Sequence, residues 1–225
     1  MKSNNPNNNS QFSIFNFQFS IIKKYMADNS NIKTQSSLPD FPLRRIKGAK
    51  KKIFAIIGSA SSNSSNLKLV NYIAASTQEN FEWNIFDRLK ELPHFNPELS
   101  ISNPPVEIIN FRETVLQADG IIICTPEYVF SIPSGLKNAI EWCVATTVFS
   151  KKLVGLITAS ANGAKGHEEL KLIIKTVYAK VMEEATLLIQ GIKGRIDEYG
   201  NIIDANTVAD LNNFIKAYKR LIEES

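Results

Sequence analysis

Two kinds of hydrophobic pattern alternate along the chain from residue 51 onward. Short continuous runs of apolar, often β-branched residues predict buried strands, and they lie at 53–57, 83–86, 121–124, 153–159 and 186–190. Between and after these runs, apolar residues recur at i, i+3, i+4 and i+7, which is typical of a helix with one apolar face. The helical segments lie at 67–74, 108–118, 133–146, 170–181 and 208–222.

Strands that alternate with helices predict a parallel sheet covered on both faces, because each crossover helix packs against the sheet. Five strands and five helices fit a three-layer α/β/α architecture with the flavodoxin-like strand order 2-1-3-4-5. The segment 88–105 contains four prolines, so we expect a long loop there. Residues 51–225 are therefore expected to form one α/β domain.

Residues 1–50 differ from this body in composition. They begin with an Asn-rich stretch and stay polar, which predicts a disordered, low-complexity tail and linker. Residues 1–52 hold ten Lys/Arg and two Asp/Glu, whereas the remaining residues hold sixteen and twenty. A basic tail is typical of a solvated segment or of one that touches nucleic acid or an anionic membrane. We expect the solvated form, and hence no nucleic-acid or membrane partner.

The apolar stretch at 12–22 does not have the features of a secretory signal. Ser, Asn and Gln interrupt it, no basic segment lies directly before it, and no small-residue cleavage site follows. A transit peptide and a translation start at Met26 are the other interpretations. No run of about 18 apolar residues predicts a transmembrane helix. Cys124 and Cys143 are too few for a disulfide framework, so we expect buried free thiols and a cytoplasmic, reducing location.

Three loops follow predicted strands, at 58–66, 125–132 and 159–166, and should meet at one edge of the sheet. The first loop, GSASSNSSN, is rich in hydroxyl groups and precedes a helix. Exposed N–H groups at a helix N-terminus suit a phosphate dianion, although N-capping alone accounts for some of these serines.

The second and third loops carry features that suit a flat cofactor. Tyr128 offers an aromatic face, and Glu127 would either contact a ligand or brace the loop. In the third loop, Gly163 and Gly166 allow positive φ and a close approach of the backbone to a ring.

Other chemistries find little support in the sequence. No G-x-x-x-x-G-K-[ST] or G-x-G-x-x-G motif follows a strand, which disfavours nucleoside triphosphate and Rossmann-type binding. No G-x-S-x-G elbow is present, and the two histidines, His94 and His167, have no Cys/His partners at metal-ligand spacing. We therefore expect no bound metal and no catalytic side chain. A redox cofactor would explain this, because the cofactor carries the reaction while the protein binds and orients it.

The stretch PEYVFSIPSGLKNAIEW, residues 126–142, resembles the NAD(P)H-dependent FMN reductase family, whose pattern is P-E-Y-N-x-S-x-P-G-x-L-K-N-A-x-D-W. Val129 stands where the family has Asn, and Ser134 where it has Gly. The first loop is similar to the family's G-S-x-R-x-x-S-x-N, with Ser61 at the Arg position, so a cationic partner for phosphate is missing there. The third loop resembles S-A-S-x-G-x-x-G-G, with His167 in place of one glycine.

The resemblance implies noncovalent FMN, hydride transfer from NADPH or NADH to flavin N5, and delivery of electrons to a quinone, azo compound, flavin or similar small-molecule acceptor. It also implies a homodimer or homotetramer. The implied FMN contacts are Ser59, Ser61, Ser64, Ser65, Asn66, Pro126, Glu127, Tyr128, Val129, Ser131, Ser160 and Gly163. Two other functions remain open: a flavodoxin-like electron carrier without a nicotinamide site, and a binding module without flavin.

Overall fold

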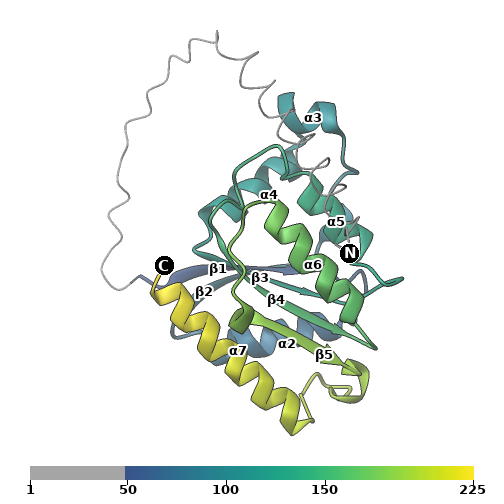
Figure 1. Ribbon diagram of the computed structural model, residues 1–225, viewed down its shortest axis with the longest axis vertical. Helices are drawn as coiled ribbons and strands as arrows, with labels where there is room; N and C mark the ends of the chain where they lie inside the picture. The colour runs from purple at the N-terminus through teal and green to yellow at the C-terminus, as the bar shows by residue number, and fades with distance from the viewer. Residues whose placement is uncertain (1–48) are drawn as a thin grey trace, which may run out of the picture. The chain divides into compact units, whose positions relative to one another are not determined.

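The computed structural model describes residues 49–225, which form a single parallel sheet with helices on both faces (Figure 1). The tail predicted for residues 1–50, with its charge and apolar stretch, lies outside the described residues except for its last two. The strand order is β2-β1-β3-β4-β5, and every neighbouring pair is parallel. The predicted flavodoxin-like topology is therefore confirmed.

The strands are short and mostly buried. Their bounds are β1 Lys51–Ile57, β2 Phe81–Phe86, β3 Gly120–Thr125, β4 Leu153–Ser160 and β5 Thr186–Gln190. All six residues of β3 are buried, because β3 lies at the centre between β1 and β4 and is covered on both faces. In register, Ala55 of β1 lies beside Ile122 of β3.

Side chains of each strand alternate between two hydrophobic layers. Ile53, Ala55 and Ile57 of β1 face the layer covered by α2 Ser65–Thr77 and α7 Ala205–Glu223. Phe54 and Ile56 face the layer covered by α4 Val106–Gln117, α5 Ser134–Glu141 and α6 Ala164–Thr176. Because all five strands are parallel, their carboxyl ends lie at the same edge of the sheet, where the helices that follow them begin.

Several predicted boundaries were wrong for local reasons. The segment 88–105 is not a continuous loop, since it contains the 3-10 helix η1 Leu89–Glu91 and the helix α3 Pro97–Ser102. Pro97 occupies the first turn of α3, where a missing N–H costs nothing, and the Asn96 side chain accepts a hydrogen bond from Leu99 N–H at 2.9 Å. Proline in this segment therefore begins a helix as well as interrupting regular structure.

The helix after β3 ends at Glu141, earlier than residue 146. Beyond it, Cys143 N–H bonds the carbonyl of Ile140, a tighter turn than the α-helix makes. Arg112 Nε donates to the Trp142 carbonyl at 2.9 Å and so caps the end of α5. The fourth helix also begins earlier and ends earlier than expected, at Ala164 and Thr176, and the last helix is longer than expected.

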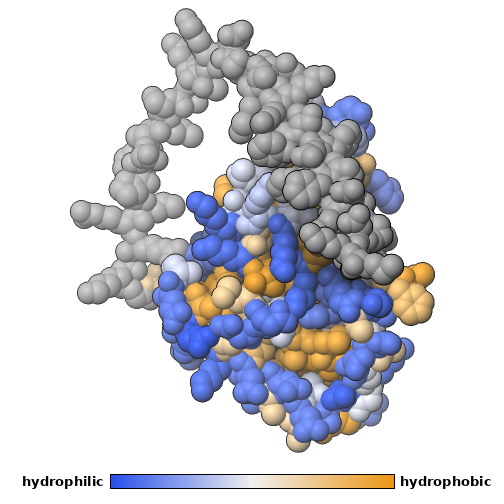
Figure 2. Space-filling view, in the orientation of Figure 1, coloured by the Kyte–Doolittle hydropathy of each residue, from blue (hydrophilic) through white to orange (hydrophobic). Residues whose placement is uncertain are grey.

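The edge strand β5 is covered less completely than the centre of the sheet. Its first three residues are half-buried, and Figure 2 shows a hydrophobic patch over this strand, whereas hydrophilic side chains cover most of the visible face. Within residues 49–225, no helix is long and apolar enough to cross a membrane. Both cysteines are free and buried, as expected.

Candidate functional site

The three predicted loops converge at the carboxyl edge of the sheet and are bonded to one another. Asn66 Nδ2, at the end of the first loop, donates to the carbonyl of Ala159 at 3.3 Å. Ser160 Oγ donates to the carbonyl of Glu127 at 3.4 Å, which joins the third loop to the second. Together they line a cavity of about 420 Å³, and the predicted residues that line it are Ser59, Ser61, Ser64, Ser65, Asn66, Pro126, Tyr128 and Ser160.

The hydroxyl groups of the first loop are arranged as donors. Ser59 Oγ accepts the N–H of Ser61 at 3.2 Å, and Ser64 Oγ accepts the N–H of Leu67 at 3.3 Å as the N-cap of α2. Ser59 and Ser64 are 8% and 5% exposed. Because each oxygen is already an acceptor, its O–H proton is available to a ligand. The N-terminus of α2 adds further N–H groups and favours an anion.

Asn66 braces the loops with its side chain. Its Nδ2 is used by Ala159 and its Oδ1 accepts from Cys124 Sγ at 3.3 Å. Both polar ends are therefore engaged within the protein, and the residue is only 3% exposed. Burial raises the pKa of the Cys124 thiol far above its usual range, so this sulfur stays protonated and unreactive.

The second loop forms a tight turn that the sequence pattern did not predict. Tyr128 and Ser131 exchange two backbone hydrogen bonds, at 2.9 and 3.0 Å. The two central residues, Val129 and Phe130, have φ of 51° and 59°. Positive φ at both central positions is the pattern of a type I′ turn, which normally carries Asn, Asp or Gly. Val129 and Phe130 are 93% and 75% exposed, so the turn presents an apolar tip to solvent.

The side chain of Glu127, the residue before the turn, bonds the N-terminal part of α6. Its Oε2 accepts the N–H of Gly166 at 2.8 Å, in the first turn of α6, where the helix dipole favours a carboxylate. A Cβ at Gly166 would lie 3.2 Å from Glu127 Cβ and Cγ, so glycine permits this close contact. Glu127 was expected either to contact a ligand or to brace the loop, and in this structure its side chain braces the loop.

The third loop bends into α6 through Gly163, whose φ is 90°. On the same helix, His167 Nδ1 lies 2.9 Å from Thr158 Oγ1, a residue of β4. Burial, and then the charge of Lys171, lowers the pKa of His167. Two residues of the third loop were predicted to contact the cofactor. Ser160 lines the cavity, whereas Gly163 does not line it and instead shapes the bend into α6.

The structure adds a fourth segment that the sequence analysis missed. Gly191, Ile192 and Lys193 follow β5 and line the same cavity. Gly191 has φ 66° and donates its N–H to the carbonyl of Ala161 at 3.1 Å. The signal was available, because β5 ends at the same edge as the other parallel strands.

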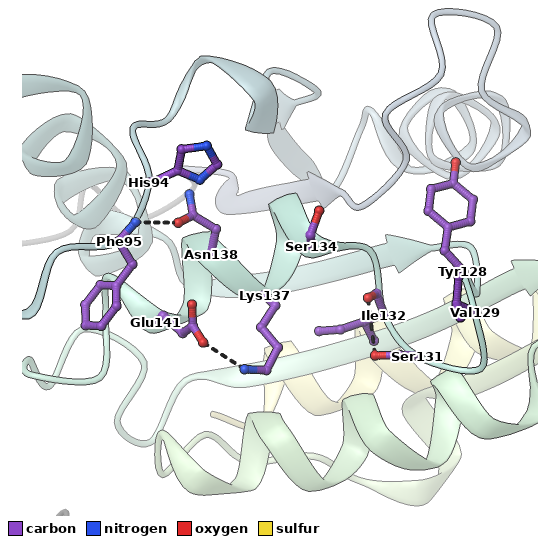
Figure 3. Close-up of a pocket in the computed structure, with 10 residues that line it drawn as sticks. All are labelled: His94, Phe95, Tyr128, Val129, Ser131, Ile132, Ser134, Lys137, Asn138 and Glu141. Carbon is purple, nitrogen blue, oxygen red and sulfur yellow. Dashed lines mark hydrogen bonds and ion pairs between the residues drawn. The ribbon is translucent and has the colours of Figure 1, made fainter.

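Tyr128 borders the cavity and also two neighbouring spaces. One, of about 810 Å³, lies between the first loop, residues 87–92 and the N-terminus of α5. The other, of about 650 Å³, is a groove along α5, which we call the α5 groove. Figure 3 shows Tyr128 and Val129 at one end of this groove and His94 and Phe95 at the other. Val129 and Ser131 thus lie on the groove and not in the smaller cavity.

A clamp from α5 fixes the far wall of the α5 groove. Asn138 Oδ1 accepts Phe95 N–H at 2.7 Å (Figure 3). Asn138 Nδ2 donates to the Pro93 carbonyl at 3.0 Å. Trp142 Nε1 donates to the same carbonyl at 2.8 Å. Both side chains match the family pattern, and their position explains the match, since they hold the connection between β2 and α4 in place.

The donors around the 420 Å³ cavity fit a phosphate-bearing flavin. Its lining includes serine hydroxyls, the N-terminus of α2, one aromatic face and one lysine, with no carboxylate side chain among the lining residues. Such a set can satisfy a dianion and pack against a ring. Within residues 49–225, no group of three or more His, Cys, Asp or Glu side chains is placed to hold a metal ion.

The fold is that of a flavodoxin-like protein, and the lining of its cavity suits a flavin mononucleotide. The model of the NADPH-dependent FMN reductase family matches residues 51–193, and the chain belongs to this family. The predictions of an oxidoreductase, of FMN and of a nicotinamide electron donor are therefore confirmed at the level of the family.

Known relatives agree with this assignment. The chain is 26% identical to a quinone reductase of Escherichia coli K12 over 77% of this chain and 96% of that protein. It is 28% identical to NADH-dependent flavin reductase subunit 2 of Lactobacillus johnsonii, over 73% and 96%. Among solved structures, the flavoenzyme NAD(P)H:(acceptor) oxidoreductase FerB from Paracoccus denitrificans is similar, with a TM-score of 0.69 and 24% identity over 77% and 98% of the two chains.

Proposed function

We propose that this protein is an NAD(P)H-dependent oxidoreductase that uses FMN to reduce a quinone, azo compound, flavin or similar small-molecule acceptor. The observation that carries the proposal is that three loops, joined by hydrogen bonds, line one cavity. No carboxylate side chain is among the residues that line it. Bound FMN would supply the hydride chemistry, and the chain's own residues bind, orient and shield it.

Ser59, Ser64 and the first-turn N–H groups of α2 would hold the phosphate. Ser61 and Ser65 lie close enough to line the same cavity, while Asn66 keeps the loop in position. Tyr128, with Pro126 and Ser160, would lie against the isoalloxazine ring, and the backbone of the turn would bond its polar edge. Val129 and Ser131 would act from the α5 groove side.

The adjoining spaces favour a reductase over an electron carrier without a nicotinamide site. The 810 Å³ space and the α5 groove both share Tyr128 with the cofactor cavity. Their volumes are in the range of about 300–1,000 Å³ that small-molecule sites occupy. A donor or acceptor molecule would therefore have room beside the ring.

The decisive experiment is purification followed by a visible absorption spectrum and cofactor analysis. FMN bound at one equivalent per chain, together with consumption of NADPH or NADH in the presence of a quinone, supports the proposal. Flavin without nicotinamide turnover would indicate the electron carrier, and a colourless protein that takes up no FMN would indicate the binding module. Tight binding of FAD with indifference to FMN would also contradict the proposal.

Three further expectations belong to the same proposal. We expect a homodimer or homotetramer, testable by light scattering. We expect a cytoplasmic location, which the two free thiols support. We also expect residues 1–50 to be dispensable, because the described residues contain the whole sheet and its helices. A chain that begins near Lys50 and fails to bind FMN would contradict this last expectation.

A further inference from the structure

The loop after β5 places one lysine at the cofactor cavity. Lys193 belongs to the short 3-10 helix η3, Ile192–Gly194. The neighbouring Ile192 is buried in the hydrophobic layer, and Gly194 N–H bonds the carbonyl of Gly191 at 3.1 Å. Gly191 in turn bonds Ala161 of the third loop. The backbone on both sides of Lys193 is therefore anchored, while its side chain remains exposed.

What distinguishes Lys193 within the described residues is its place at the cavity together with the absence of a carboxylate partner. Lys137, Lys165, Lys171 and Lys219 each pair with a glutamate. Within residues 49–225, Lys193 forms no such pair, and it is the one charged residue among those that line the 420 Å³ cavity. An unpaired ammonium in a space lined with hydroxyl groups, and with no carboxylate side chain among the lining residues, favours an anion there.

Ser61 lies in the same cavity and occupies the position at which the family pattern has arginine. The first loop thus offers hydroxyl and N–H donors to the phosphate but no positive charge. Since a dianion needs charge compensation as well as hydrogen bonds, a cation from another segment would complete the site.

We propose that Lys193 supplies the cation for the FMN phosphate, in place of the arginine that Ser61 replaces. The proposal rests on the proposed function, because it concerns a contact to the same cofactor. It assigns a fourth loop to the cofactor site, and it explains how a chain with serine at position 61 would still offer a positive charge to the phosphate.

The test compares FMN with riboflavin, which has the same ring but no phosphate. Dissociation constants of both flavins are measured by fluorescence quenching for the wild type, K193Q, K193R and the matched control K216Q, a change at an exposed lysine of α7. We expect K193Q to weaken FMN about fivefold to tenfold, while riboflavin changes less than about twofold. K193R should keep most of the FMN affinity, and K216Q should keep all of it.

A second arm restores the charge from the other loop. In the K193Q background, S61R should recover FMN affinity without improving riboflavin. The FMN affinity of the wild type should also fall more steeply with salt than that of K193Q, because a charged contact is screened. Circular dichroism of each variant confirms that the fold is retained.

The outcomes separate the two proposals. If the wild type binds neither flavin, the proposed function fails, and this inference fails with it. If the wild type binds FMN but K193Q leaves the ratio of FMN to riboflavin affinity unchanged, the cofactor assignment stands and the role of Lys193 is overturned. Equal binding of both flavins by the wild type would likewise show that no cation contacts the phosphate.

Discussion

The two ends of the cofactor site are built by opposite means. At the end proposed to hold the phosphate, Ser59, Ser64 and Asn66 are small, buried and hydrogen-bonded within the protein. At the turn, Val129 and Phe130 are large, exposed and held in the left-handed region of backbone conformation. One end is fixed by internal bonds, and the other protrudes from the surface beside the α5 groove.

This difference suggests a division of roles. Pre-formed donors do not have to be ordered when a ligand binds, so the phosphate end should determine affinity. The turn makes few internal contacts and stores backbone strain, which is typical of segments that act on a ligand more than they stabilise the fold. Changes at the phosphate end should therefore alter dissociation constants, whereas changes at the turn should alter rates.

The largest effect is expected from removing both buried hydroxyls of the first loop. The double change Ser59→Ala and Ser64→Ala should weaken FMN roughly 100-fold, since each bond to a charged group is worth about 1.5–3 kcal/mol. Ser64→Ala alone should cost roughly tenfold. Isothermal titration of the apoprotein with FMN measures both.

Ser64 also caps α2, so its loss could act through stability. Ser64→Gly separates the two effects, because glycine at an N-cap costs only a few tenths of a kcal/mol. This variant should keep the urea midpoint of the wild type and still lose FMN affinity. Unchanged affinity in the double alanine variant would remove the first loop from the site.

A smaller effect, on rate more than on affinity, is expected at Tyr128. Tyr128→Ala removes a stacking contact worth about 1 kcal/mol, which corresponds to about a fivefold loss of FMN affinity. Because Tyr128 also borders the two adjoining spaces, its loss should slow reduction of bound FMN by NADPH about tenfold or more. Stopped-flow absorbance follows this reduction. Tyr199→Ala, at an exposed tyrosine outside these cavities, is the matched control. Reduction of the Tyr128 variant at the wild-type rate would make the turn a structural brace.

The sequence predicted the hydroxyl groups that line the cavity better than the turn, and the reason is physical. Small polar residues between a strand and a helix have few arrangements, so the position of Ser59 and Ser64 at the cavity could be expected from the pattern. The turn could not, because valine and phenylalanine normally avoid positive φ and give no local signal for a type I′ turn. The two backbone hydrogen bonds between Tyr128 and Ser131 close the turn, and no side-chain pattern predicts such bonds.

Two other features depend on contacts between distant segments. Asn66 was predicted to contact FMN. Its side-chain amide instead bonds Ala159 and Cys124, which only the packed sheet brings together. The position of Lys193 at the cavity was not predicted, although the fifth strand ends at the same edge of the sheet as the others. The sheet order itself was predictable, since alternating strands and helices leave few topologies.

Strain in the turn can be tested directly with Val129→Asn. Asparagine tolerates the left-handed region, so the variant should be more stable than the wild type by about 1 kcal/mol. Urea unfolding measures this change. Leu172→Asn, at an exposed residue within α6, is the control and should give no gain. The same Val129 variant should change the flavin potential and the rate of FMN reduction while FMN affinity moves little. A loss of stability would show that the turn is not strained at Val129.

The smallest effect is expected at His167, on helix α6, whose Gly166 N–H bonds Glu127 next to the turn. Burial and then Lys171 lower its pKa in the folded protein, against weaker raising effects of Glu183 and Glu168. The unfolded chain, whose histidine has a pKa of about 6.5, therefore binds the proton more tightly than the folded protein does. Protonation thus favours unfolding, so the contribution of neutral His167 is fully present above the unfolded pKa and is lost as pH falls below it.

His167→Gln should lose less stability than the wild type between about pH 7.5 and 5.5. Urea unfolding at these two pH values gives the comparison, and parallel losses in both proteins would show that His167 does not titrate with folding. FMN affinity at pH 7.5 should stay the same in both, because His167 bonds Thr158 behind the cavity and does not line it.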